Sequence, residues 1–275
     1  MANITASLVN ELRKRTGVGM MDCKKALVEC DGDMDKAIDY LREKGQKLAA
    51  KRADRDASEG AVLAAVNQDK TFAAVIMMNC ETDFVAKNDG FVDFAKSVLN
   101  AAIAAKAKDL QAVMSLTIDG VSVETMIIEQ VAKIGEKITL SHYLPIEAPA
   151  AYAYVHPGNR MASVVGLSKT GYDEEGKEMA MQVIAGRPVA LNKATVPAEV
   201  IEREMEVYRG QVREEGKPEN MVEKIAEGKL NKFFKESTLL SQEYTREAKV
   251  SVEEHLKKID KDLTVTAFQR AELGE

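Results

Sequence analysis

Residues that could do chemistry are few in this chain and lie far apart. The three histidines, His142, His156 and His255, show neither an HExxH motif nor the Cys/His spacing of a zinc site, so we expect no metal centre. The stretch Gly17–Lys25 contains two glycines and ends in two lysines. It lacks the GxxxxGKS/T spacing of a phosphate-binding loop, and it follows a helical pattern instead of a strand. The sequence therefore predicts no nucleotide site of its own.

The cysteines do not form a reactive set either. Cys23, Cys30 and Cys80 make neither a CxxC pair nor an even disulfide framework, which is typical of proteins in a reducing cytosol. Cys80 could act as a nucleophile if a histidine folded against it. The apolar run before Cys80 and the scarcity of histidines favour a buried, inert thiol. We therefore expect no enzyme activity and no bound cofactor.

Composition and charge exclude several classes of protein. Apolar residues make up 45% and charged residues 30% of the 275 residues, as in ordinary soluble proteins. The net charge of −6 is spread over both signs without a basic stripe, so direct binding to nucleic acid is not expected. The first residues lack the pattern of a secretory signal, and no apolar run approaches the roughly 20 residues that span a bilayer. These features predict a cytoplasmic protein that binds no membrane.

The first 60 residues predict a small helical domain and a linker. Residues 1–45 contain three short amphipathic segments, the first capped by Thr5 and the second by Asp22. Three helices of this length enclose only a small core. Residues 46–60 are charged and alanine-rich without a continuous apolar face, which indicates a partly helical linker.

The remaining residues predict an α+β core in two halves. Residues 61–145 begin with two strands and an amphipathic helix, and residues 146–275 repeat this order about 90 residues later. We therefore expect a duplicated core in which each half has an antiparallel sheet and helices. The expected strands are 61–66, 72–78, 137–143, 151–155, 161–167 and 263–268, and the expected helices are about 89–103, 122–134, 173–186 and 251–259.

An antiparallel helical hairpin is expected as an insertion in the second half, at about 197–236. Apolar residues recur at helical spacing on both sides of the turn Gly216–Pro218. Glutamate and lysine are abundant in both helical segments, so we expect this hairpin to project from the body of the protein.

Apolar residues stand in two places where the sequence does not decide between core and contact. Phe84 lies in the segment Asn79–Phe91, in what should be a polar connection between a strand and a helix. Its side chain either fills the nearby core or is presented to a partner. Met20 and Met21 pose the same question in the helical domain, where the usual role of methionine as a gap filler favours the core.

Two longer motifs resemble the bacterial elongation factor Ts family. The segments Asn79–Asn88 (NCETDFVAKN) and Thr16–Leu27 (TGVGMMDCKKAL) match signatures of this family nearly letter for letter, in the same order and at matching spacing. Residues Val131–Glu136 and the turn Gly216–Pro218 extend the similarity over essentially the whole chain. The resemblance implies a ubiquitin-associated-like three-helix domain, a two-part α+β core and a coiled-coil hairpin. It also implies guanine-nucleotide exchange on elongation factor Tu, the GTPase that brings aminoacyl-tRNA to the ribosome.

The resemblance further implies roles for particular residues. One motif enters the nucleotide domain of the partner and displaces its magnesium ion; its residues here are Thr82, Asp83, Phe84 and Val85, with Ala86 as a neighbouring contact. Met20 and Met21 match positions that contact the same domain, and His156 resembles a core tip that meets another domain of the partner. Asp83 acts either electrostatically or by orienting its neighbours, and the simplest alternative for it is an ion pair with Lys87, four residues on.

Further expectations concern the end of the chain and its association. Well-known members of the family continue beyond the last core strand into a C-terminal helical module. Because this chain ends at Glu275, we expect that contact to be absent or supplied by another surface. The sequence leaves open whether two copies associate through the core or the hairpin. An adaptor or chaperone-like binding module is the alternative function, and it predicts binding without faster nucleotide release and indifference to changes at Phe84.

Overall fold

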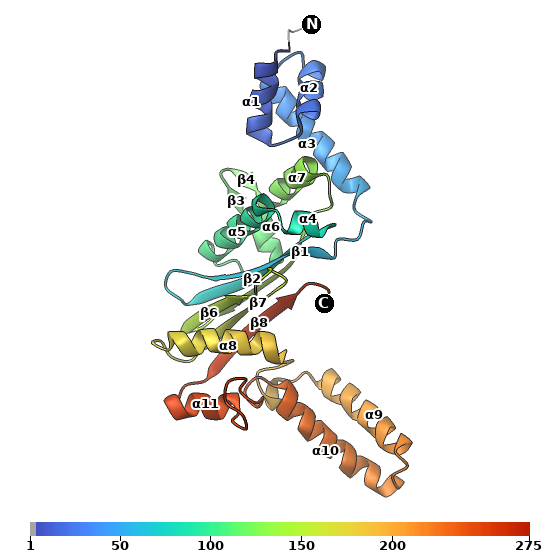
Figure 1. Ribbon diagram of the computed structural model, residues 1–275, viewed down its shortest axis with the longest axis vertical. Helices are drawn as coiled ribbons and strands as arrows, with labels where there is room; N and C mark the ends of the chain where they lie inside the picture. Colours follow the sequence, from blue (N-terminus) through green and yellow to red (C-terminus); the bar gives the residue numbers. More distant parts are fainter. Residues whose placement is uncertain (1–3) are drawn as a thin grey trace.

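The computed structural model describes residues 4–275 and shows an α+β protein (Figure 1). A helical domain stands at one end, two stacked antiparallel sheets with helices on their outer faces form the middle, and a helical hairpin projects from the other end (Figure 1). Every helix within residues 4–275 is too short or too polar to span a bilayer.

Three helices form the N-terminal domain: α1 (Ala6–Thr16), α2 (Met20–Glu29) and α3 (Met34–Lys51). Thr5 caps α1 as expected, because its hydroxyl accepts a hydrogen bond from the Leu8 amide at 3.2 Å. The expected cap at Asp22 is wrong, since α2 begins earlier, after Gly19. Asp22 lies in the first turn of α2 and pairs with Lys44 of α3 at 2.5 Å. The buried faces form a small core of their own, which comprises Val9, Leu12, Val18, Cys23, Ala26, Leu27, Ala37 and Leu41.

The linker expected at 46–60 is helical over its first part. Helix α3 continues to Lys51, so only the residues from Arg52 to Ser58 connect it to the first strand. The extension is stabilised by packing that the local sequence does not reveal, because Gly45 and its neighbours lie against α7 (Val123–Ile134) of the core. Helix α3 therefore belongs both to the N-terminal domain and to its contact with the core.

Two three-stranded antiparallel sheets form the core. The first has the order β1 (Glu59–Val66), β2 (Phe72–Cys80), β5 (Thr139–Glu147), and the second has the order β6 (Ala150–Val155), β7 (Met161–Leu167), β8 (Val265–Glu272). Helices cover the outer face of each sheet, so the layers run helix, sheet, sheet, helix (Figure 1). The first sheet carries α4 (Asp83–Ala86), α5 (Asp89–Ala104), α6 (Leu110–Ser115) and α7; the second carries α8 (Asp173–Gly186) and α11 (Val252–Ile259). A short pair, β3 (Thr117–Ile118) and β4 (Val121–Ser122), precedes α7.

Alternation along the strands explains this layering. Successive side chains of a strand point to opposite faces of its sheet. In β2 both faces are buried: Ala74 and Ile76 pack under the helices, whereas Ala73 and Val75 pack against the second sheet. A strand buried on both faces needs a continuous apolar run, which is why β2 reads as one in the sequence.

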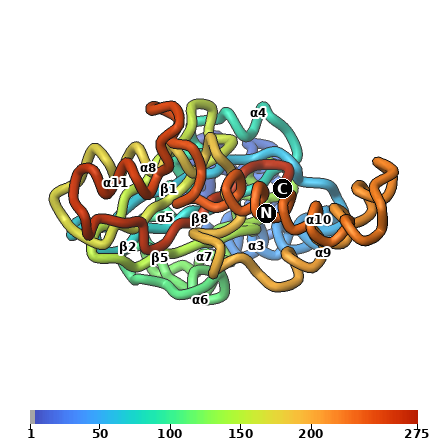
Figure 2. The backbone as a smooth tube through the Cα atoms, turned by 90° about the horizontal axis from the view of Figure 1, so that it is seen from below, coloured from blue at the N-terminus to red at the C-terminus, as the bar shows by residue number. Residues whose placement is uncertain are grey.

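The helical hairpin consists of α9 (Ala198–Glu214) and α10 (Glu219–Ser237), preceded by a short 3-10 turn at Lys193–Thr195. It points away from α8 and α11 in both views (Figures 1 and 2). Val212, Val222 and Ala226 are buried between its helices. Ion pairs bridge the two helices; they are Arg209–Glu223, Arg213–Glu219 and Lys229–Glu215. Exposed pairs of this kind contribute little individually, so the apolar seam holds the hairpin.

The strands differ from expectation mainly at their ends. The strand expected at 137–143 runs from Thr139 to Glu147, and the closing strand expected at 263–268 runs from Val265 to Glu272. The capping box expected for α11 is present, since Ser251 and Glu254 bond to each other's backbone amides.

Candidate partner-binding site

The connection between β2 and α5 carries a feature that its counterpart in the second sheet lacks. After β2, residues 81–88 contain the one-turn helix α4, whereas after β7 the connection to α8 is only residues 168–172. Figure 2 shows α4 at the outline of the molecule, away from the packed interior. The additional turn is not needed to close the fold, which makes it a candidate for contact with another molecule.

Phe84 is presented to solvent by this turn. Its side chain is 83% exposed, although the two residues that follow it are anchored in the core. Val85 is half-buried and packs against the main cluster under the first sheet's helices. Ala86 is buried in the same cluster, with 9% of its surface exposed. The side chain of Ala86 is therefore not placed to touch a partner as expected; it holds the turn in the core.

The start of α4 is held by polar contacts. Glu136, which follows the C-terminal cap Gly135 of α7, accepts hydrogen bonds from the amides of Glu81 and Thr82 at 3.1 and 3.0 Å through one carboxylate oxygen. Its other oxygen accepts from the Thr82 hydroxyl at 2.7 Å. The same hydroxyl accepts from the Val85 amide at 3.4 Å and so caps α4. A residue more than 50 positions away in the chain therefore fixes the first turn of α4.

Glu81 connects this turn to the linker. Its carboxylate accepts from the Lys137 amide at 2.6 Å and from the Arg52 guanidinium at 2.7 Å. These contacts, the Lys137 amide first and Arg52 after it, hold the pKa of Glu81 below its usual value. The Lys137 ammonium in turn donates to the carbonyls of Ala53 and Arg55, at 2.7 and 2.9 Å. The linker, α4 and the start of β5 thus meet at one junction.

Asp83 makes the ion pair that the spacing predicted. Its carboxylate lies 2.6 Å from the Lys87 ammonium, and this hydrogen bond lowers the pKa of Asp83. Both side chains are well exposed, with 75% of Lys87 and 48% of Asp83 accessible, so the pair adds little to folding stability. Asp83 therefore remains free to exchange Lys87 for a charged group of another molecule.

Met20 and Met21 are not core, contrary to the preference that composition gave them. Met21 is 76% exposed and Met20 is 50% exposed. The buried face of α2 is formed by Cys23, Ala26 and Leu27. Sequence reasoning missed Val28, which is 55% exposed and follows Met21 by seven residues, hence on the same face of α2. These three side chains form an exposed apolar stripe on the N-terminal domain.

His156 is exposed at the turn between β6 and β7. Its ring nitrogen Nδ1 lies 3.1 Å from the Tyr154 hydroxyl. Gly158 and Asn159 take positive φ angles of 90° and 55°, which the sharp turn requires. The Asn159 carbonyl accepts from the Val62 amide at 2.7 Å, so this turn is fastened to β1. The structure thus presents His156 on a rigid tip of the core.

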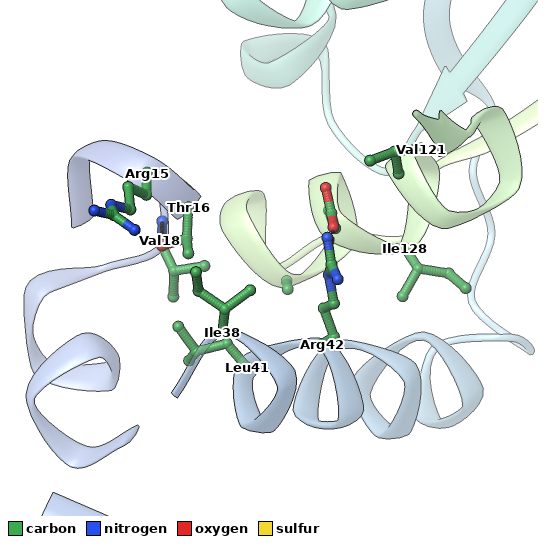
Figure 3. Close-up of a pocket in the computed structure, with 11 residues that line it drawn as sticks. Arg15, Thr16, Val18, Ile38, Leu41, Arg42, Val121 and Ile128 are labelled. Carbon is green, nitrogen blue, oxygen red and sulfur yellow. Dashed lines mark hydrogen bonds and ion pairs between the residues drawn. The ribbon is translucent and has the colours of Figure 1, made fainter. Parts of the chain in front are cut away.

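A groove of about 280 Å³ separates the N-terminal domain from α7. Figure 3 shows Ile38, Leu41 and Arg42 rising from α3 into it, with Val121 and Ile128 approaching from the other side. Arg42 bridges it to Glu129 of α7 at 2.9 Å. The groove lies where α3 packs against α7, so it is a seam between two packed units.

Comparison with known proteins shows which family this chain resembles. The family model described as elongation factor TS matches residues 81–275, which include α4, strand β5 of the first sheet, the whole second sheet and the hairpin. A second model, for the N-terminal region of mitochondrial elongation factor Ts, matches residues 1–49. The chain belongs to the elongation factor Ts family.

Full-length relatives agree with this assignment. The chain is 50% identical over 276 residues to elongation factor Ts of Christiangramia forsetii, with 100% of both chains covered. It is 46% identical to elongation factor Ts of Flavobacterium psychrophilum, again with 100% of both chains covered. It is 47% identical to that of Amoebophilus asiaticus, with 98% of this chain and 99% of the relative covered. The similarity extends over every module of the fold.

Proteins of the elongation factor Ts family are nucleotide-exchange factors in translation elongation, without catalytic chemistry of their own. Burial raises the pKa of the Cys80 thiol to about 12, and the thiol donates to the Thr82 carbonyl at 3.2 Å, so it is an inert structural group. Within residues 4–275 no cluster of three or more potential ligands could hold a metal ion.

Proposed function

We propose that this chain promotes the release of GDP from elongation factor Tu by inserting the turn Thr82–Val85 into the nucleotide domain of that GTPase and dislocating its Mg²⁺. The observation that carries the proposal is Phe84, a large apolar side chain that is 83% exposed on a turn anchored at both ends. An anchored apolar side chain loses little conformational freedom when it is buried in a partner.

Burial of Phe84 alone supplies too little free energy to displace a tightly bound nucleotide. Burial of a phenylalanine removes about 150–250 Å² from water. At about 25 cal/mol/Å² this amounts to roughly 4–6 kcal/mol at most. A nucleotide bound with nanomolar affinity is held by about 12 kcal/mol. The remainder must come from a wider interface and from the loss of the Mg²⁺ that bridges the partner and the phosphates.

Exchange is then a coupling between two ligands of one GTPase. The factor and the nucleotide each weaken the binding of the other by the same factor, because linkage is reciprocal. An excess of GTP therefore releases the factor after GDP has left. Asp83, half exposed beside Phe84, supplies a negative charge at the point where Mg²⁺ is lost.

The wider interface is proposed to include the exposed stripe of α2 and the tip of the core. Met20, Met21 and Val28 offer adaptable apolar contacts to the same nucleotide domain. His156 meets a second domain of the partner from its rigid turn. Ala86 acts indirectly, because its buried methyl group anchors α4.

The architecture is proposed to follow the same family plan. The three helices at 1–45 form a ubiquitin-associated-like domain, and 61–145 and 146–275 form the two halves of a duplicated core. The like order of strands in both sheets, first, second and last in each half, supports duplication. The hairpin at 197–236 is an insertion in the second half. A cytoplasmic location, no direct contact with nucleic acid, and self-association through the core or the hairpin are further parts of the proposal.

Release of a fluorescent GDP analogue from elongation factor Tu tests the proposal in a stopped-flow instrument. We expect the release rate to rise with the concentration of this protein and to reach a plateau. Equal release rates with and without the protein would overturn the proposal, and binding to elongation factor Tu without faster release would favour an adaptor.

A further inference from the structure

The turn that carries Phe84 cannot keep its shape by itself. Helix α4 has four residues, and the first turn of a helix is unfavourable to form because several residues are ordered for one hydrogen bond. The apolar anchors lie on its C-terminal side, at Val85 and Ala86. On the N-terminal side the capping bond from the Val85 amide to the Thr82 hydroxyl is long, at 3.4 Å. The N-terminal side of α4 therefore depends on Glu136.

The carboxylate of Glu136 satisfies three donors at once. It accepts from the amides of Glu81 and Thr82, at 3.1 and 3.0 Å, and from the Thr82 hydroxyl at 2.7 Å. A carboxylate only accepts hydrogen bonds, and bonds to an ionised acceptor are stronger than neutral ones. Because the Thr82 hydroxyl donates its hydrogen bond to Glu136, a lone pair of the hydroxyl oxygen is left to face the Val85 amide. Glu136 thus sets both the backbone before α4 and the cap of α4.

Glu136 lies between two elements of the packed core, so its hydrogen bonds connect α4 to a rigid part of the protein. It follows Gly135, which ends α7 with a φ of 84°, and it precedes β5, the partner strand of β2. The two elements that flank Glu136, helix α7 and strand β5, therefore belong to the packed core. The Glu136 side chain therefore holds α4, which has few apolar contacts of its own, at a fixed position relative to the core.

We propose that Glu136 is a positioning residue for nucleotide exchange, which holds α4 in the one arrangement that presents Phe84 to the GTPase. The inference rests on the proposed function of Thr82–Val85. If Phe84 is correctly placed in only a fraction of molecules, the insertion step is weakened by that fraction. Docking through α2 and His156 does not depend on this turn. Loss of Glu136 therefore lowers the plateau of the release rate while the half-saturating concentration stays nearly constant.

The test compares variants at Glu136 and Thr82 in the stopped-flow assay over a range of factor concentrations. For Glu136→Ala we expect a plateau at least about tenfold lower, because the variant removes all three bonds and the loss of even one bond to a charged acceptor corresponds to about tenfold. Glu136→Gln keeps an amide oxygen for the backbone donors and should recover part of the rate. Thr82→Val should lower the plateau, and Thr82→Ser, which keeps the hydroxyl, should lower it less. The double variant Glu136→Gln with Thr82→Val should lose less than the two losses combined, because the two residues share one bond.

A matched control separates positioning from general stability. Glu178 also has a partly buried carboxylate, which accepts from the Tyr244 hydroxyl at 2.5 Å, but it lies on α8, across both sheets from α4. Glu178→Gln should leave the plateau unchanged. A variant that only unfolds in part would raise the half-saturating concentration and reach the normal plateau.

The outcomes distinguish this inference from the proposed function. A normal plateau for Glu136→Ala and Thr82→Val, together with a lowered plateau for Phe84→Ala, would overturn the role of Glu136 and leave the exchange mechanism intact. A normal plateau for Phe84→Ala would overturn the exchange mechanism, and the role of Glu136 with it. If Glu136→Ala does not fold, Glu136→Gln and Thr82→Val decide the question, since both preserve side-chain volume.

Discussion

Gly45 of α3 approaches Ala132 of α7 so closely that a Cβ atom on Gly45 would lie 2.9 Å from the methyl carbon of Ala132. The Ile128 carbonyl would be 3.3 Å from the same position. Glycine inside a helix costs up to about 1 kcal/mol relative to alanine. The close approach explains why glycine occupies this position, because it lets α3 rest on α7 and fixes the N-terminal domain to the core.

Two identical substitutions should therefore have opposite effects. Gly45→Ala gains helix propensity but pushes α3 away from α7, at the cost of about 1–3 kcal/mol typical of overpacking. Gly210→Ala in α9 meets no atom within 4 Å and should raise the melting temperature by about 2–4 °C. Calorimetry checks both. In the release assay Gly45→Ala should raise the half-saturating concentration, since Met20 and Met21 are displaced, whereas Gly210→Ala should not. A Gly45→Ala protein that is more stable than wild type would contradict the close contact.

Phe84→Ala should slow GDP release without loss of stability. The side chain is 83% exposed and contributes little to the core, so its removal should change the free energy of unfolding by less than about 0.5 kcal/mol. Phe91→Ala, seven residues further on, is the contrast: Phe91 is 1% exposed, and its loss should cost about 3–5 kcal/mol. Thermal unfolding and stopped-flow release on both variants check this. Strong destabilisation by Phe84→Ala would show instead that the Phe84 side chain packs in the core.

Much of the fold could be predicted from local patterns. The two-face burial of β2 follows from its continuous apolar run, and the hairpin of α9 and α10 follows from apolar residues at helical spacing around Gly216. The cap of α5 at Asn88 is a local signal too, since its side chain accepts from the amide of Gly90 at 3.0 Å. Each of these features depends on residues close in the chain.

The site could be predicted only in part, because its supports are distant in the chain. The motif around Phe84 directs attention to the turn of α4, but Glu136 lies more than 50 residues away and no local pattern marks it as an acceptor for Thr82. The extension of α3 to Lys51 also depends on α7. Composition alone favours a buried Met21, because methionine usually fills gaps in the core, whereas the register of α2 turns it outward with Val28.

The three cysteines should differ in their reaction with a thiol reagent. Cys23 and Cys80 are buried, and burial raises the pKa of Cys80 to about 12, so both should stay unmodified in the folded protein at pH 8. Cys30, at the end of α2, is partly exposed and should react first, although desolvation raises its pKa as well. Labelling followed by peptide mass spectrometry assigns the sites. Fast modification of Cys80 in the folded protein would show that β2 opens near α4.

Glu81 should make the stability of the junction dependent on pH. Because the Lys137 amide and Arg52 favour its ionised form, the pKa of Glu81 is lower in the folded protein than its usual value of 4.5. Its contribution is therefore fully present above pH 4.5 and is lost as the pH falls through the folded-state pKa. Glu81→Gln should lower the melting temperature at pH 7 by about 2–4 °C per kcal/mol lost, and the difference from wild type should shrink as the pH falls below 4.5. Glu43→Gln, at an exposed position without an ion pair in residues 4–275, is the control and should differ little from wild type at any pH. Differential scanning calorimetry between pH 3.5 and 7 makes the comparison, and a constant difference across this range would mean that the charge of Glu81 does not stabilise the junction.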